Sequence, residues 1–216
     1  MQFPNPLEAD DDGLVAVSEE ITPNMVYNAY CSGIFPWPID DEYVYWFSPN
    51  PRAIVHFDNF RIPKTVKREL KKCNFKFTFN QQFDNVIEHC SKLKRRNEEG
   101  TWITPKIIEC YKEFHKLGFA VSCEVLDVDN NDKLVGGLYG VLLNNNYFAG
   151  ESMFNTVDHA AKFALVNMVE YLKENYDISW IDCQVLNPFL GRFGVYEVSR
   201  EKFVDKINGC NFLQPQ

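Results

Sequence analysis

Three apolar segments joined by short polar turns limit most strongly what this chain can fold into. Residues 120–128, 134–143 and 147–154 have the apolar, β-branched and aromatic content of strands. The two linkers between them, Asp129-Asn130-Asn131-Asp132 and Asn144-Asn145-Asn146, consist of residues that favour tight turns. The three segments therefore predict consecutive antiparallel strands in one sheet.

A helix and a further strand are predicted after these segments. Residues 157–175 carry apolar side chains at helical spacing, and residues 178–185 have the pattern of a strand that returns to the sheet. An antiparallel meander followed by a helix and a strand is similar to the core of GNAT-like (acetyltransferase-type) N-acyltransferases, a resemblance at the level of fold. We expect an α+β fold with a mainly antiparallel sheet, and a last short helix or strand at residues 200–207.

The first 60 residues differ from the rest in their proline content. They hold seven of the 11 prolines, so long regular elements are not expected there. A helix should begin at Thr22 or Pro23 and end before Gly33, and residues 43–47 should form a strand. We therefore predict a small N-terminal domain over residues 1–60 and a GNAT-like domain over residues 61–216. The larger domain should start with a helix at 63–72, a strand at 75–79, and helices at 81–95 and 104–118.

Charge is unevenly distributed along the chain. The net charge is −8, yet residues 61–96 contain 11 basic and three acidic residues, which leaves 11 basic and 27 acidic residues elsewhere. Two basic runs that flank a Phe-rich strand suit a polyanion-binding patch, although such runs also occur on the solvated faces of helices. The candidate binding residues are Arg61, Lys64, Lys67, Arg68, Lys71, Lys72, Lys94, Arg95 and Arg96.

Several classes of protein are not expected from this composition. Residues 1–13 lack the basic and apolar regions of a secretory signal, and no window is long and apolar enough to cross a membrane. Seven scattered cysteines suit reduced thiols in the cytoplasm. The cysteine and histidine spacings match no zinc-binding pattern, so we expect no metal site.

Two polar groups stand out within apolar strand patterns. Strand alternation places Asp182 and Gln184 on one face and Cys183 on the other. From this feature alone, a structural pair and a catalytic pair are equally open. Glu151 follows a strand at the point where the chain turns toward a helix, which is a common place for ligands to bind. The turn at residues 155–158 lacks the glycines that cradle a pyrophosphate, which disfavours coenzyme A.

Aromatic residues cluster beside Pro and Gly at residues 46–52 and 100–103. Such side chains usually lie in a core, but they can also form the walls of a pocket for a large apolar group.

Taken in order, six segments of the chain resemble the leucyl/phenylalanyl-tRNA–protein transferase family, over about residues 13–203. These are Phe35-Pro36-Trp37, Trp46-Phe47-Ser48-Pro49-Asn50-Pro51-Arg52, Gly100-Thr101-Trp102-Ile103, Leu134-Val135-Gly136-Gly137-Leu138-Tyr139-Gly140-Val141, Gly150-Glu151-Ser152-Met153-Phe154 and Ile181-Asp182-Cys183-Gln184.

The resemblance implies an aminoacyltransferase with a small N-terminal domain on a GNAT-like domain, using neither a metal nor another cofactor. Such enzymes move Leu or Phe from charged tRNA to the α-amine of proteins with N-terminal Arg or Lys, which marks them for N-degron degradation. It also implies a cytoplasmic protein with no membrane contact, and we expect a monomer.

The resemblance further assigns roles to residues. Asp182 and Gln184 would lie at the reacting centre, with Asp182 polarising Gln184 or orienting the acceptor amine, and Glu151 would contact the aminoacyl-adenosine end. The basic residues named above would hold the tRNA acceptor arm through its phosphates. Our candidates for the apolar pocket are Trp46, Trp102, Phe148 and Met153.

Two segments depart from the family pattern. Ser18-Glu19-Glu20-Ile21 stands where relatives usually have Gly-Gly-Asp-Leu, and Asn187-Pro188-Phe189-Leu190 stands where they usually have Thr-x-His-Leu. Phe189 thus replaces a histidine. Two alternatives therefore stay open, an acyl-CoA-dependent N-acyltransferase of similar fold and a non-catalytic module that binds tRNA or peptide.

Overall fold

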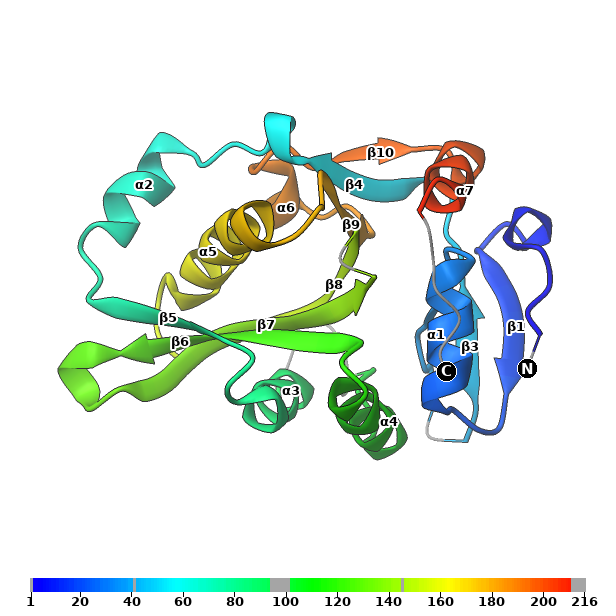
Figure 1. Ribbon diagram of the computed structural model, residues 1–216, viewed down its shortest axis with the longest axis horizontal. Helices are drawn as coiled ribbons and strands as arrows, with labels where there is room; N and C mark the ends of the chain where they lie inside the picture. Colours follow the sequence, from blue (N-terminus) through cyan, green and yellow to red (C-terminus); the bar gives the residue numbers. More distant parts are fainter. Residues whose placement is uncertain (1, 41, 94–101, 145, 211–216) are drawn as a thin grey trace.

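A seven-stranded sheet forms the centre of the computed structural model, which describes residues 2–40, 42–93, 102–144 and 146–210 (Figure 1). The strands lie in the order β10-β4-β9-β8-β7-β6-β5, and every neighbouring pair is antiparallel except β8 and β9. This confirms the expected α+β class with a mainly antiparallel sheet. The strands are β4 (Arg52–His56), β5 (Phe75–Phe79), β6 (Ala120–Asp127), β7 (Lys133–Leu143), β8 (Tyr147–Asn155), β9 (Trp180–Gln184) and β10 (Tyr196–Val198).

Helices cover both faces of this sheet. The long helix α5 (Ala160–Asn175) packs on one face, and α3 (Phe83–Ser91) and α4 (Pro105–Lys116) pack on the other (Figure 1). The start of α4 follows its sequence, because the Thr104 hydroxyl accepts a hydrogen bond from the Ile107 N–H and Pro105 occupies the first turn. The remaining helices of the larger part are η2 (Phe57–Asn59), α2 (Lys64–Leu70), η3 (Val128–Asn130), α6 (Pro188–Gly191) and α7 (Arg200–Asn208).

Some predicted bounds are too long. The helix expected from residue 157 begins at Ala160, since His159 adopts a left-handed conformation with φ of 72° immediately before it. The helix expected over 81–95 ends at Ser91 as α3. Near the C-terminus, the sequence left a helix and a strand as alternatives. The chain forms the helix α7 there, capped by the Ser199 hydroxyl.

A smaller three-stranded sheet, in the order β1-β3-β2, lies beside the large one (Figure 1). It contains β1 (Leu14–Ser18), β2 (Phe35–Pro36) and β3 (Val44–Phe47), and it is accompanied by η1 (Pro6–Glu8) and α1 (Pro23–Cys31). Strand β4, which falls within the predicted N-terminal domain, pairs in the large sheet. Buried side chains of α1 and β3 form one apolar cluster with those of α3, α4, β7 and β8, so the two sheets share a core.

Within the described ranges, no helix is both long and apolar enough to span a membrane.

Candidate active site

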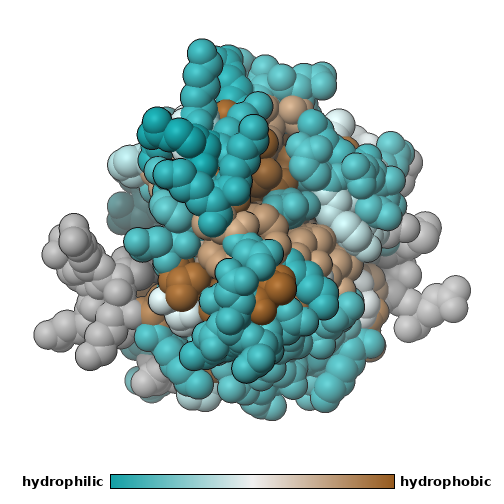
Figure 2. All heavy atoms as spheres, turned by 90° about the vertical axis from the view of Figure 1, so that its left-hand side faces the viewer, coloured by the Kyte–Doolittle hydropathy of each residue, from teal (hydrophilic) through white to brown (hydrophobic). Residues whose placement is uncertain are grey.

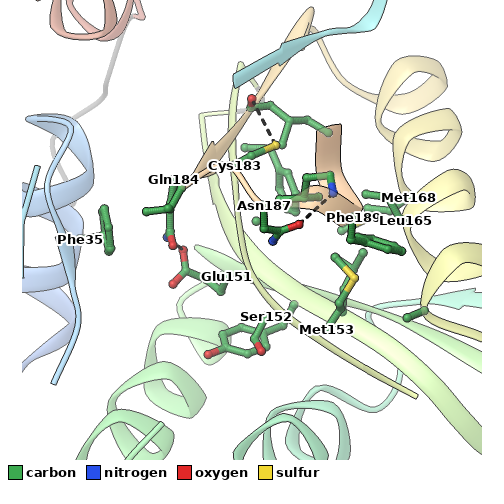
Figure 3. Close-up of a pocket in the computed structure, with 18 of the residues that line it drawn as sticks. Phe35, Glu151, Ser152, Met153, Leu165, Met168, Cys183, Gln184, Asn187 and Phe189 are labelled. Atoms are coloured by element: carbon green, nitrogen blue, oxygen red, sulfur yellow. Dashed lines mark hydrogen bonds between the residues drawn. The ribbon is translucent and has the colours of Figure 1, made fainter. Parts of the chain in front are cut away.

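The cavity of interest opens where β8 and β9 separate. These parallel strands pair only at Phe148 with Ile181 and at Ala149 with Asp182. Beyond these pairs lies a cavity of about 560 Å³, within the size range of sites for small ligands. Its walls come from β8, β9, α5, α6 and the residues around β2, so both sheets contribute to it (Figure 3).

Glu151 lies at an irregularity in β8. Opposite β7, Tyr139 pairs with Ser152 and Gly140 pairs with Gly150, which leaves Glu151 as an extra residue in the ladder. The bulge allows Glu151 and Ser152, adjacent in sequence, both to border the cavity. The Ser152 hydroxyl is buried and has no hydrogen-bond partner among the described residues.

Among the residues that the structure describes, only uncharged groups donate to the Glu151 carboxyl. Tyr30 donates to Oε1 at 2.6 Å, Gln184 Nε2 donates to the same oxygen at 2.8 Å, and Tyr111 donates to Oε2 at 3.3 Å. Burial raises the pKa of Glu151 to about 8, against the lowering effect of the Tyr30 hydrogen bond and with a smaller contribution from the charge of Asp182. Glu151 can therefore exchange a proton near neutral pH.

Gln184 ends β9 in a left-handed conformation with φ of 60°. Its backbone N–H donates to Asp182 Oδ1 at 2.9 Å, while its side chain reaches Glu151 on the other strand. The Glu151–Gln184 hydrogen bond thus crosses the gap between the diverging strands. Figure 3 shows Phe35 on one side of this bridge and Met153 and Phe189 on the other.

Asp182 belongs to a buried ion pair. It accepts two hydrogen bonds from Arg52, at 2.9 Å from Nε and 2.6 Å from Nη2, and a third from the Tyr147 hydroxyl at 2.7 Å. Both charged side chains are fully buried. Asp182 does not border the cavity, whereas Cys183 and Gln184 both do. The prediction that Asp182 and Gln184 share a face away from Cys183 is therefore wrong, because the left-handed turn at Gln184 breaks the strand alternation.

Arg52 is held on several sides. Its guanidinium lies 4.6 Å from the centre of the Phe35 ring and 4.4 Å from that of Phe203, and its Nη1 donates to the Gly33 carbonyl at 3.2 Å. Burial alone would lower the pKa of Arg52, but the charge of Asp182 raises it above its ordinary value. Arg52 therefore connects α1, β2 and α7 to the strand that carries Asp182 and Gln184.

Known proteins match this chain over most of its length. Residues 54–208 match the family described as leucyl/phenylalanyl-tRNA protein transferase, and residues 19–50 match the N-terminal domain of that family. The chain belongs to this family. A transferase of this name from Lawsonia intracellularis (strain PHE/MN1-00) is 46% identical over 208 residues, covering 96% of this chain and 89% of the relative. One from Flavobacterium johnsoniae is 43% identical over 203 residues, covering 94% and 93%.

The solved structures that match this member of the leucyl/phenylalanyl-tRNA–protein transferase family are less similar to it than the relatives named above. A GCN5-related glucosamine N-acetyltransferase region of a fungal multi-domain β-N-acetylglucosaminidase has a TM-score of 0.48 and 11% identity, and the match covers 76% of this chain and 20% of that one.

Three of the four predicted pocket residues border the cavity of this transferase, namely Trp102, Phe148 and Met153. The prediction that Trp46 lines the pocket is wrong. Its ring is fully buried in the small sheet, where it donates to the Ser18 hydroxyl and packs against Phe3. The reason is strand alternation, since β3 turns Trp46 toward the core of the small sheet.

Trp37 borders the cavity instead, with its ring centre 6.4 Å from that of Trp102. The sequence offered a signal for this residue, because Phe35-Pro36-Trp37 is one of the family segments. No sequence signal selected Leu165 or Met168 as pocket residues, whereas Phe189 stood out in the sequence as a departure from the family pattern. These three side chains form the apolar wall opposite Phe35 (Figure 3). Phe189 contributes an aromatic ring to this wall.

Six predicted tRNA-binding residues are exposed in and around α2, and none of them has an ion-pair partner in the part of the chain that the structure describes. They are Arg61, Lys64, Lys67, Arg68, Lys71 and Lys72. Figure 2 looks at this side of the molecule, where hydrophilic side chains cover α2 above and the ends of β5, β6 and β7 below, with an apolar furrow between them. Lys94, Arg95 and Arg96 lie outside the described residues.

Among the residues that the structure describes, no group of three or more His, Cys, Asp or Glu side chains is arranged to hold a metal ion.

Proposed function

We propose that this chain transfers Leu or Phe from charged tRNA to the α-amine of proteins whose first residue is Arg or Lys, and so marks them for N-degron degradation. The observation that carries the proposal is the apolar cavity with the Glu151–Gln184 hydrogen bond between its two walls. It offers an aliphatic and aromatic wall for an isobutyl or benzyl group next to polar groups for the reacting ester and amine.

The reaction needs positioning more than activation, because an aminoacyl ester is already reactive. The acceptor nitrogen attacks the ester carbonyl, the C–N bond forms, and the ester C–O bond breaks to release the ribose oxygen of the tRNA. The amine loses a proton and the ribose oxygen gains one. No covalent intermediate on the protein is required.

Gln184 is suited to orient the amine. Its Nε2 is engaged with Glu151, while its Oε1 has no hydrogen-bond partner among the described residues and can accept from the acceptor amine. Asp182 acts through this residue rather than on the substrate, since it binds the Gln184 backbone and does not border the cavity. We assign Asp182 as a positioning residue.

Glu151 is the group in the cavity best suited to move the proton. A pKa of about 8 places it close to the pH at which a general acid or base is most effective.

The side-chain pocket is formed by Phe148, Met153, Leu165, Met168 and Phe189. Methionine and leucine side chains adapt to ligands of different shape, which suits a pocket that takes both an isobutyl and a benzyl group. A charged side chain would lose its hydration there without gaining a partner, so it is excluded.

One assay tests the transfer. The protein is incubated with labelled phenylalanyl-tRNA and an Arg-initiated peptide, without coenzyme A. Transfer of label to the peptide supports the proposal. Tight tRNA binding without transfer would show a binding module instead, and transfer only from an acyl-CoA donor would show the other alternative.

The exposed cations around α2 would hold the tRNA through its phosphates. Lys67→Glu together with Lys71→Glu should weaken tRNA binding and flatten its salt dependence, while Lys116→Glu together with Lys202→Glu, also exposed, serves as a control of equal charge change. Equal tRNA affinity in the double variant and the control would remove α2 from the interface.

The cytoplasm is the compartment we assign. All seven cysteines are free thiols, as expected in a reducing environment.

A further inference from the structure

A second cavity lies against the first, on the side of the small sheet. It measures about 300 Å³ and is lined by Asp12, Phe35, Trp37, Ile39, Phe47, Pro49 and Val185. Phe35, Trp37 and Val185 line both cavities. Val185 directly follows Gln184, so a ligand that reaches Gln184 in the first cavity has access to the second.

The walls of the second cavity are apolar apart from one carboxylate. Asp12 is exposed, and its carboxylate has no hydrogen-bond or ion-pair partner in the part of the chain that the structure describes. A cavity of this composition suits a side chain with a long apolar stem and a cationic end, because the stem packs against rings while the charge meets the carboxylate.

The position of Asp12 is fixed by the turn that contains it. The Gly13 N–H donates to the Asp10 carbonyl at 3.0 Å, and the Leu14 N–H donates to Asp10 Oδ1 at 2.7 Å. Gly13 has φ of 88°, and a Cβ there would lie 2.8 Å from Pro49 Cα, so the turn packs closely on the cavity wall. The buried Arg200 of α7 also binds the Asp10 carbonyl. The backbone of the turn that carries Asp12 is therefore held in place before any ligand arrives.

The charge of the surrounding chain favours a cation. Residues 1–51 contain nine Asp and Glu residues and no Lys or Arg, and Arg52 is the first basic residue of the sequence. This surplus repels tRNA phosphates and attracts a basic peptide end. The tRNA cations proposed above begin only at Arg61.

We propose that the second cavity receives the side chain of the acceptor's first residue, and that Asp12 selects Arg or Lys there. This inference rests on the proposed function and assigns its acceptor subsite. With the acceptor amine at Gln184, the stem of the side chain lies along Phe35 and Phe47, and its charged end pairs with Asp12. A neutral side chain would leave that carboxylate unpaired.

The test compares Asp12→Asn with Asp11→Asn, a control that removes the same charge from the neighbouring exposed residue outside the cavity. Each protein is assayed with two peptides that differ only in their first residue, arginine or its neutral isostere citrulline. Asp12→Asn should raise KM for the Arg-initiated peptide about tenfold, with kcat and the KM for aminoacyl-tRNA little changed. The citrulline-initiated peptide should react equally with both variants and the unaltered protein.

Asp12→Lys extends the test. Charge reversal should lower kcat/KM for the Arg-initiated peptide further than Asp12→Asn does, while circular dichroism shows an unchanged fold because the side chain is exposed. Equal preference for arginine over citrulline in all the proteins would overturn the subsite and leave the transferase function standing. Absence of transfer by the unaltered protein to any peptide would overturn both.

Discussion

Glu151 and Asp182 are two buried carboxylates on neighbouring strands, but only Glu151 borders the cavity. Their partners differ as well. Asp182 faces a guanidinium, whereas among the described residues Glu151 faces only hydroxyl and amide donors. A buried carboxylate with a cationic partner stays charged and links two parts of the structure. With neutral partners only, burial raises the pKa of the carboxyl toward neutral pH. The difference teaches that burial alone does not suit a carboxylate to proton transfer; its partners and its access to the cavity decide.

The largest effect is expected from Asp182→Ala. Transfer should fall by roughly 100-fold or more at little cost in tRNA affinity, because Gln184 loses the group that fixes its backbone. Unfolding free energy should also fall by about 3–5 kcal/mol, since Arg52 is left buried and unpaired. Single-turnover transfer, tRNA binding and urea unfolding measure these three quantities.

A matched double variant separates the two effects of that change. Arg52→Met with Asp182→Leu replaces the pair by apolar groups and should recover most of the stability without recovering transfer. Recovered transfer would mean that Asp182 contributes only stability.

Glu151→Gln should produce the next largest effect. The amide keeps an oxygen that can accept from Tyr30 and Gln184 but cannot exchange a proton, so transfer should fall about 10- to 100-fold with the fold retained. Rates at saturating peptide and tRNA measure the loss. A variant as active as the unaltered protein would assign the proton transfer to another group.

The pH dependence of stability should reveal Glu151 directly. Its pKa is about 8 in the folded protein and close to 4.5 in the unfolded chain, so the folded state binds the extra proton. The resulting stabilisation is complete below pH 4.5 and is lost as pH rises through 8. Urea unfolding at pH 5, 6.5 and 8 should show this decline in the unaltered protein, and a shallower one in Glu151→Gln. Parallel curves would contradict the raised pKa.

The smallest effects are expected from removing single hydroxyls. Tyr30→Phe removes the hydrogen bonds of that hydroxyl with Glu151 and Tyr111, and Tyr147→Phe removes the one to Asp182, at a cost of about 1 kcal/mol for each bond. Only Tyr30→Phe should move the pH dependence of transfer to higher pH, because Tyr30 lowers the pKa of Glu151. Tyr147→Phe is the control, and an equal shift in both would show that the two carboxylates titrate as one unit.

Local pattern was enough to predict much of the fold. The turn residues at 129–132 and 144–146 and the cap at Thr104 specify strand and helix limits within a few residues. Short elements such as β1 and β10 were not predicted, because they are stabilised by pairing with β3 and β4 rather than by their own pattern.

The sequence by itself determined the α+β class, the family, and the identity of Glu151, Asp182 and Gln184 as residues that merit attention. Only the tertiary structure decided the role of each of these residues, because their partners are distant in sequence. Arg52 lies 130 positions from Asp182, and Tyr30 lies 121 positions from Glu151. The same holds for Trp37 and Trp46, which come from neighbouring segments of the small sheet, since only the packing of that sheet shows that Trp37 borders the cavity and Trp46 does not. Packing of the whole chain brings together partners that are so distant in sequence, and local sequence patterns do not predict these contacts.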